Sequence, residues 1–154
     1  MLTIPTPRTH DERVAAARLR LEQEFQMWLS TGGRAGPHLI PVAFVEDGDT
    51  IVTATGTGSR TVRHLQETGR ARVALGTTSD VVMIDATLDR LVPVPEVATE
   101  LADRFAAVSH DPRQMPGYVY LRLLPHRVQV WNGFHEFPGR TVMLEGEWLP
   151  HPVD

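Results

Sequence analysis

The chain has 154 residues, which predicts a single domain spanning residues 1–154 that is large enough to bury a hydrophobic core. Its net charge of −4 argues against a nucleic-acid binder, and the absence of cysteine excludes disulfides, thiolate metal sites and cysteine nucleophiles. Because no apolar run is long enough to cross a bilayer and the first residues do not resemble a signal peptide, we expect a cytoplasmic protein with no membrane partner.

The chain begins with an expected loose tail over residues 1–8, followed by a helix. Thr9 and Glu12 match the capping-box pattern, so the helix should begin there and end near residues 22–24. Residues 25–29 then have the composition of a first strand.

Two turn signals follow this first strand. Residues 31–37 have the composition of a turn, and Asp47-Gly48 is a strong hairpin signal. We therefore predict that a strand over residues 38–46 pairs antiparallel with a strand over residues 50–55. Pro41 indicates that part of the earlier strand lies at a sheet edge or a bulge.

The second half of the chain alternates between helical and strand periodicity. The predicted elements are a helix at 59–68, strands at 70–75 and 81–88, a helix from Pro95 to Val108, a strand at 118–131 bent at Pro125, a short strand at 141–144 and a loose tail at 150–154. This order predicts a mainly β fold, an antiparallel barrel of about six strands with three helices as caps.

Residues 51–65 combine a strand, two glycines and a helix start. Ser59 can serve as the N-cap, and Arg60 and Arg63 lie three residues apart on the new helix. Unpaired backbone amides, a hydroxyl and two guanidinium groups predict a phosphate site. The alternative is an ordinary strand-to-helix connection with solvated arginines. The chain contains no lysine, so any anion site must be built from arginine.

No other motif in the sequence predicts a nucleotide-binding, phosphate-binding or metal site. Gly56-Thr57-Gly58 lacks the third glycine of a dinucleotide loop, and a phosphate-binding P-loop needs a lysine. His135-Glu136 alone is no metal signature, so we expect no metal site. No residue is a convincing acid or base, and the catalytic residues stay unknown.

Several pieces of the sequence, in order, carry a family resemblance. They are Pro37–Val42, the hairpin, Thr55–Arg60, Arg72–Leu75 and Val130–Gly133. Together they resemble the pyridoxamine 5'-phosphate oxidase-like split-barrel superfamily of FMN- and deazaflavin-dependent oxidoreductases. The resemblance implies a split β-barrel that forms a homodimer, with cofactor sites between the subunits.

The resemblance also implies roles for residues on either side of the hairpin. The strand 39–44, including Pro41, Val42 and Ala43, would lie against the cofactor ring, largely through its backbone. Thr55 would contact the cofactor where the strand gives way to the turn, and Ser59 and Arg60 would face its phosphate.

Three further positions bear on the resemblance. Thr61 stands where the family commonly has lysine, and we infer that Arg63 substitutes for that lysine one turn along the helix. Trp131 resembles the tryptophan that reaches the cofactor from the partner subunit, although a core aromatic is an alternative interpretation. Arg140 lies where the oxidase branch has an arginine near the ring.

The function implied by the resemblance is redox chemistry on a small organic substrate with FMN or the deazaflavin coenzyme F-420. The alternative is a protein that binds a flavin, haem or other planar ligand without turnover, which the missing lysine at Thr61 favours. Pyridoxamine-phosphate oxidation itself has less support, because the substrate-phosphate residues of that branch are not matched. We expect the loops 30–37 and 110–117 to line the substrate pocket.

Overall fold

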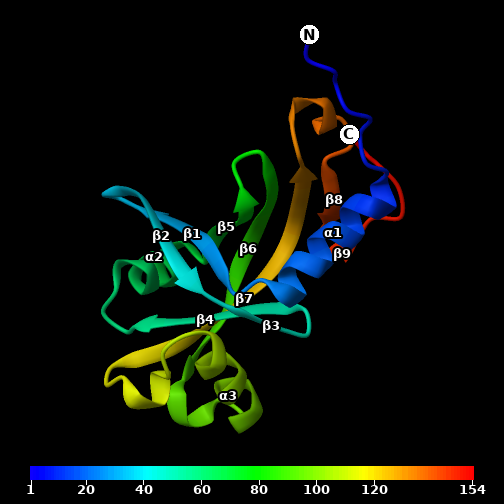
Figure 1. The fold of residues 1–154 in the computed structure, drawn as a ribbon. Helices are drawn as coiled ribbons and strands as arrows, with labels where there is room; N and C mark the ends of the chain where they lie inside the picture. The colour runs from blue at the N-terminus through cyan, green and yellow to red at the C-terminus, as the bar shows by residue number, and fades with distance from the viewer.

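The computed structural model describes all 154 residues and contains nine strands and three α-helices. The helices are α1 (His10–Gln23), α2 (Arg60–Thr68) and α3 (Thr99–Val108). The strands are β1 (Gln26–Gly33), β2 (Gly36–Ala43), β3 (Val45–Asp47), β4 (Thr50–Gly56), β5 (Arg70–Thr77), β6 (Asp80–Pro93), β7 (Tyr118–Trp131), β8 (Thr141–Leu144) and β9 (Glu147–Trp148). Every pairing is antiparallel, which confirms the predicted mainly β fold (Figure 1).

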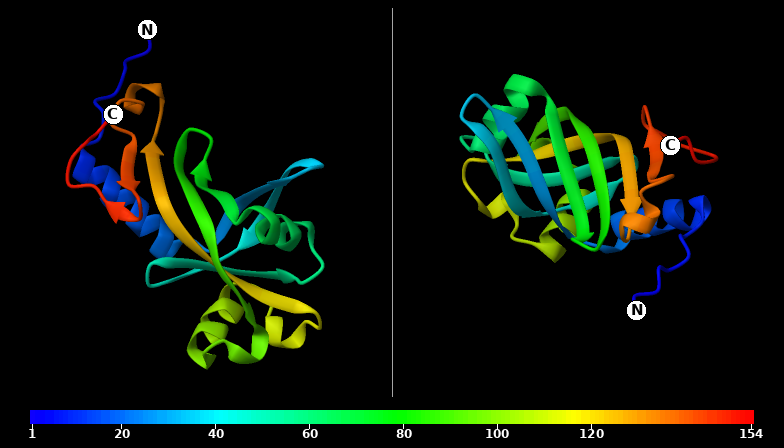
Figure 2. Two further views of the ribbon diagram at one scale, coloured as in Figure 1. Left: turned by 180° about the vertical axis from the view of Figure 1, so that it is seen from behind. Right: turned by 90° about the horizontal axis from the view of Figure 1, so that it is seen from above.

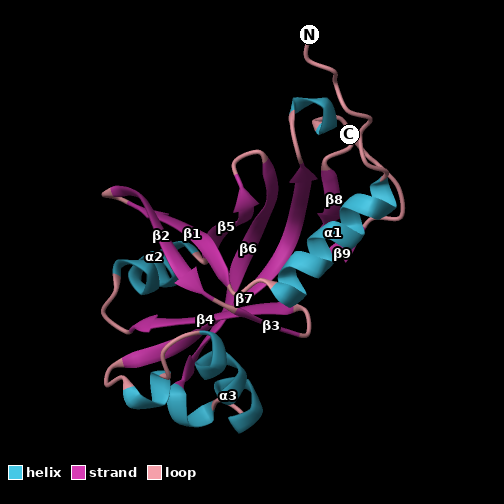
Figure 3. Ribbon diagram, viewed as in Figure 1, coloured by secondary structure: helices cyan, strands magenta, loops and turns pink.

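The strands lie in the order β2-β1-β5-β6-β7-β4-β3, with β8 and β9 added beside β7. Viewed from above, they curve round into a barrel (Figure 2). The helices lie on its outside, with α1 along the β7–β8 side, α2 on another side and α3 at one end (Figure 3). The main hydrophobic cluster fills the barrel, and a smaller one lies between α3 and the strands.

A bend at Phe44 closes the barrel. Residues before it belong to β2 and pair with β1, whereas residues after it belong to β3 and pair with β4. Phe44 is fully buried, and its amide donates to the carbonyl of Phe25. The predicted continuous strand 38–46 paired with 50–55 is therefore wrong: only residues 45–47 pair across the Asp47-Gly48 hairpin.

The predicted turn at residues 31–37 is mostly strand. The β1–β2 ladder continues until Gly33 faces Gly36, so only Arg34 and Ala35 are left for the turn. Gly36 has φ of 105°, a conformation that favours glycine, and this local requirement explains the turn-like composition.

The strands β6 and β7 are both 14 residues long and pair along most of their length. A register shift lies opposite Pro125, which confirms the predicted bend. Successive side chains of β7 belong to different hydrophobic clusters. Val119 and Leu121 lie in the cluster inside the barrel, whereas Tyr120 packs in the cluster under α3.

The three helices begin with different local signals. The capping box at Thr9 and Glu12 forms as predicted, and Ser59 caps α2. The third helix begins at Thr99 and not at Pro95, because Pro95 lies in a single 3-10 turn and Val97 is extended.

Hydrogen bonds hold the inner end of the N-terminal tail and the last residue of the C-terminal tail. Arg8 contacts Glu136, and the Asp154 carboxylate accepts from the hydroxyl of Thr141 at 2.7 Å. The Asp154 carbonyl also accepts from the amide of Gly139. None of the three helices has the length and apolar character needed to cross a membrane.

Candidate functional site

The start of α2 has the geometry expected of an anion site. The Ser59 hydroxyl accepts a hydrogen bond from the Val62 amide at 3.2 Å, and the Ser59 amide donates to the carbonyl of Gly56. The backbone amides of Arg60 and Thr61, which follow the cap, have no acceptor within the helix. The first turn of α2 contains no acidic residue. Its N-terminal positive charge is therefore not neutralised locally.

The two arginines of this turn are exposed and have no carboxylate partner. Neither Arg60 nor Arg63 forms an ion pair. The Arg63 guanidinium makes one long hydrogen bond, 3.4 Å to the carbonyl of Gly58. Both guanidinium groups are thus free to bind an anion in front of the helix.

The start of α2 adjoins β2. The imidazole rings of His38, on β2, and His64, on α2, meet edge to face with their centroids 6.0 Å apart. Buried His64 is fixed by a 3.0 Å hydrogen bond between its Nδ1 and the hydroxyl of Thr31 on β1. Desolvation lowers the pKa of His38, and the charges of Arg60 and His64 lower it further. Arg60 is therefore close enough to β2 for its charge to act there.

The predicted ring-binding residues lie along the same strand. As predicted from Pro41, β2 is an edge strand, and Pro41 itself is exposed opposite Trp28. Val42 packs against the barrel core, and the carbonyl of Ala43 accepts from the Thr53 hydroxyl of β4 at 2.7 Å. An edge strand keeps one row of backbone groups unpaired, so β2 offers donors and acceptors to a ligand.

Thr55, on β4, lies beside the start of β7, whereas Trp131 lies at the end of β7. Thr55 pairs with Val119 near the start of that strand and is the next-to-last residue of β4, before the turn into α2. Trp131 is the last residue of β7 and pairs with Val81. Within one chain β2, the end of β4 and the start of α2 lie together, whereas the far end of β7, which Trp131 terminates, is remote from α2 (Figure 1).

Trp131 begins a loop rich in aromatic residues. Its ring meets the Phe137 ring edge to face with the centroids 5.9 Å apart, and the Arg140 guanidinium lies over the Phe137 ring, 5.4 Å from its centroid. Trp131 and Arg140 thus both contact Phe137.

Thr61 does not contribute to the exposed surface at the start of α2. Its side chain is buried, and its hydroxyl has no hydrogen-bond partner. The residue that replaces the usual lysine is therefore a short side chain turned into the protein, and the exposed charge in this turn comes from Arg60 and Arg63.

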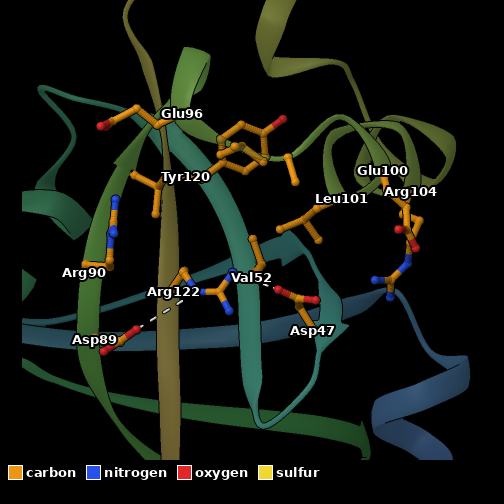
Figure 4. Close-up of a pocket in the computed structure, with 13 residues that line it drawn as sticks. Asp47, Val52, Asp89, Arg90, Glu96, Glu100, Leu101, Arg104, Tyr120 and Arg122 are labelled. Atoms are coloured by element: carbon orange, nitrogen blue, oxygen red, sulfur yellow. Dashed lines mark hydrogen bonds and ion pairs between the residues drawn. The ribbon is translucent and has the colours of Figure 1, made fainter.

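A separate cavity of about 420 Å³ lies between α3 and the strands (Figure 4). Its apolar floor includes Val52, Leu101 and Tyr120. Its charged residues are Asp47, Asp89, Arg90, Glu96, Glu100, Arg104 and Arg122. Arg122 lies between Asp47, at 2.8 Å, and Asp89, at 4.0 Å. None of the predicted cofactor-binding residues lines this cavity.

A wider groove of about 1360 Å³ includes the β1–β2 hairpin, the end of α2 and the adjoining parts of β5 and β6. Residues 30–34, 36 and 37, from the segment expected to line a substrate pocket, border this groove. The loop 110–117 does not line it. No group of histidine and acidic side chains could hold a metal ion.

Sequence reasoning missed the buried Glu136 and its partner Arg8. The Glu136 carboxyl is completely buried. Burial alone would raise its pKa, but hydrogen bonds from Arg8 and Asn132 and the charge of Arg8 outweigh burial and lower the pKa to about 2. No motif marks this pair, because its members are 128 residues apart in sequence.

Comparisons with known proteins agree with this architecture. The family model of pyridoxamine 5'-phosphate oxidase matches residues 14–132. Among curated proteins, none matches the chain.

Three solved structures illustrate the shared fold. An F-420 reductase is 18% identical with a TM-score of 0.60, covering 72% of this chain and 94% of its own. A putative pyridoxamine 5'-phosphate oxidase from Listeria innocua is 21% identical with a TM-score of 0.59, covering 80% of this chain and 98% of its own. An FAD-binding protein from Mesorhizobium loti is 13% identical with a TM-score of 0.57, covering 75% of this chain and 89% of its own.

The structural likeness confirms the split-barrel fold, and the family model covers most of the chain. With the strand order and the helix start described above, these matches establish that the chain belongs to the pyridoxamine 5'-phosphate oxidase family.

Proposed function

We propose that this protein is an oxidoreductase that uses FMN or coenzyme F-420 on a small organic substrate. The observation that carries the proposal is the start of α2, where Arg60 and Arg63 have no carboxylate partner beside the exposed edge of β2. A phosphate-bearing planar cofactor has one anionic end and one polar ring, and this juxtaposition offers a complement to both. The family and the flavin-related names of similar structures support the same class.

Each element then has a distinct binding role. Ser59, Arg60 and Arg63 hold the phosphate, while Thr55 and the backbone of residues 41–43 hold the ring. The bound flavin or deazaflavin supplies the hydride or electron transfer, and the protein supplies position and electrostatics.

We propose that the working form is a homodimer with its cofactor sites between subunits. Trp131 lies too far along β7 to join the start of α2 within one chain, so only a second copy can bring it there. The outer face of the barrel supports such an assembly. Pro41, Trp28, Ala74 and Met83 follow one another across neighbouring strands, and the Trp28 side chain is 48% exposed. Pro41 is also exposed, and Ala74 and Met83 are half-buried. A continuous apolar row that solvent reaches is typical of an interface.

Calorimetric titration tests the cofactor proposal. The purified protein is titrated with FMN and, separately, with coenzyme F-420, alongside the variants Arg60→Ala and Arg90→Ala. Arg90 is an exposed arginine of β6 remote from α2, so it is a matched control. We expect one cofactor to bind and Arg60→Ala to weaken it about tenfold, or 1.4 kcal/mol, with no change for Arg90→Ala. Binding of neither cofactor, or equal binding by Arg60→Ala, would contradict the proposal.

The second candidate function is binding of a flavin, haem or other planar ligand without turnover. The buried Thr61 favours it, because the family's usual phosphate-binding lysine is absent. Reduction of the bound cofactor by a nicotinamide or deazaflavin donor separates the two functions. A cofactor that binds but resists both donors would support the binding protein.

A further inference from the structure

The loop that carries Trp131 is held by a buried ion pair. We call residues 131–140, between β7 and β8, the Trp131 loop. Glu136 lies at its centre and is completely buried, although neighbouring Phe134 and Phe137 are 72% and 47% exposed. The loop therefore directs its aromatic rings outward and its carboxylate inward.

Four hydrogen bonds converge on the Glu136 carboxylate. The Arg8 amide donates to Oε1 at 2.8 Å, and the Arg8 guanidinium donates through Nε at 3.0 Å and through Nη2 at 2.8 Å. The Asn132 amide, one residue after Trp131, donates the fourth at 2.9 Å. The carboxylate thus connects the N-terminal segment directly to the residue that follows Trp131.

A second arginine supports the same loop from α1. Buried Arg13 donates through Nη1 to the carbonyls of Glu136 and Pro138, at 2.8 and 3.2 Å, and through Nε to the carbonyl of Arg8. The loop backbone is therefore anchored at residues 132, 136 and 138, on both sides of Phe137.

Arg8 is the only cation that touches the Glu136 carboxylate. A buried carboxylate that loses its cation is strongly unfavourable, so the loop conformation depends on Arg8 being in place. Arg20 lies close by and has the same side-chain exposure, 22%, but it pairs with Asp80 and Glu24 and not with Glu136.

We propose that Arg8 and Glu136 are positioning residues for the cofactor site. They fix the Trp131 loop so that Trp131, Phe137 and Arg140 meet a planar aromatic ligand held by α2 of a second copy of the chain. The N-terminal segment of one subunit thereby sets the affinity of a site shared with the other. This inference rests on the proposed function, because the ligand is the proposed cofactor.

The test compares Arg8→Gln with Arg20→Gln, the matched control. Hydrogen–deuterium exchange of the Trp131 loop is measured in the ligand-free protein, and the Kd for FMN and for coenzyme F-420 is measured by titration. For Arg8→Gln we expect loop exchange to accelerate and cofactor affinity to fall about tenfold or more, as misplacement of supporting groups typically causes. For Arg20→Gln we expect neither quantity to change.

The two readouts separate the possible failures. If the wild-type protein binds neither cofactor, the proposed function fails, while the exchange data still report whether Arg8 holds the loop. If the wild-type protein binds and Arg8→Gln loosens the loop without weakening binding, the positioning role is overturned. Unchanged exchange in Arg8→Gln overturns it as well.

A second variant covers the case in which Arg8→Gln does not fold. Glu136→Gln keeps the shape and one acceptor oxygen of the side chain but removes its charge. We expect a weaker cofactor affinity than in the wild-type protein, together with faster exchange of the Trp131 loop. Wild-type affinity in Glu136→Gln would overturn the inference.

Discussion

At the scale of single residues, Glu136 shows how partners decide the state of a buried acid. Removing a carboxylate from water favours its neutral form, yet three donors from Arg8 and one from Asn132 reverse that preference. Its pKa falls from an ordinary 4.5 to about 2. The group is ionised in the folded protein well below the pH at which it is protonated in the unfolded chain.

This difference predicts a pH-dependent stability. As the pH falls from about 4.5 to about 2, the unfolded chain takes up a proton that the folded protein does not, so the free energy of unfolding decreases. The lowered pKa corresponds to about 3 kcal/mol, present above that window and lost through it. Denaturant unfolding of wild type and Glu136→Gln between pH 6 and pH 2 should therefore show a stability difference that shrinks by this amount.

Exposed Glu147 provides the control for that measurement. The stability difference between wild type and Glu147→Gln should stay nearly constant over the same range. Parallel curves for wild type and Glu136→Gln would show that Arg8 does not hold the carboxylate as described.

At the scale of elements, α2 is defined by its two ends. Ser59 caps its start, and Gly69 ends it in the left-handed conformation, with φ of 68° and an amide that donates to the carbonyl of Leu65 at 2.8 Å. These local devices fix where the helix begins, and so where Arg60 and Arg63 project.

We predict that Gly69→Ala lowers the free energy of unfolding by about 1 kcal/mol, because an L-residue is disfavoured at this φ. A Cβ added at Gly69 would meet no atom within 4 Å, so backbone conformation alone accounts for the loss. Gly58 has equally open surroundings and no left-handed φ. Gly58→Ala should therefore change stability by less than about 0.5 kcal/mol in the same denaturant experiment. Equal effects of the two substitutions would contradict the argument.

Features that depend on residues close in sequence were predictable from the sequence. Pairing between strands distant in sequence was harder to predict. The Thr9 and Ser59 caps and the bend at Pro125 follow from local chemistry, and the structure has all of them. The bend at Phe44 was missed, because it follows from pairing with strands before and after it in the chain.

The candidate site likewise has a part that the sequence predicts and a part that it does not. The start of α2 could be placed from its own residues, since a cap and two arginines lie within five positions. Arg8 and Glu136 could not, because each is an ordinary charged residue until the fold brings them together. The α3 cavity likewise joins residues from five separate segments, and no pattern in the sequence connects them.

At the scale of the whole molecule, the outer face of the barrel predicts self-association. The row that crosses Trp28 is apolar, the Trp28 side chain is 48% exposed, and continuous apolar surface of this kind marks an interaction site. We expect light scattering after gel filtration to give a dimer for the wild-type protein and a monomer for Trp28→Glu. Leu19→Glu, at an equally exposed apolar residue of α1, should leave the dimer intact. A dimer for all three proteins would place the interface elsewhere.

The segment that carries α3 leaves and rejoins the barrel at a single rung. Pro93 and Val119 face each other across β6 and β7, so everything between them is an excursion from one hairpin. A short turn could replace that excursion without breaking another β6–β7 rung, and the loss from β4 would be the single Gly56–Tyr118 pair. The replacement would uncover Val52, Val92 and Tyr120, which pack beneath α3. Evolution of this fold can therefore replace the whole segment between Pro93 and Val119 in one step. The replacement requires polar side chains in place of Val52, Val92 and Tyr120.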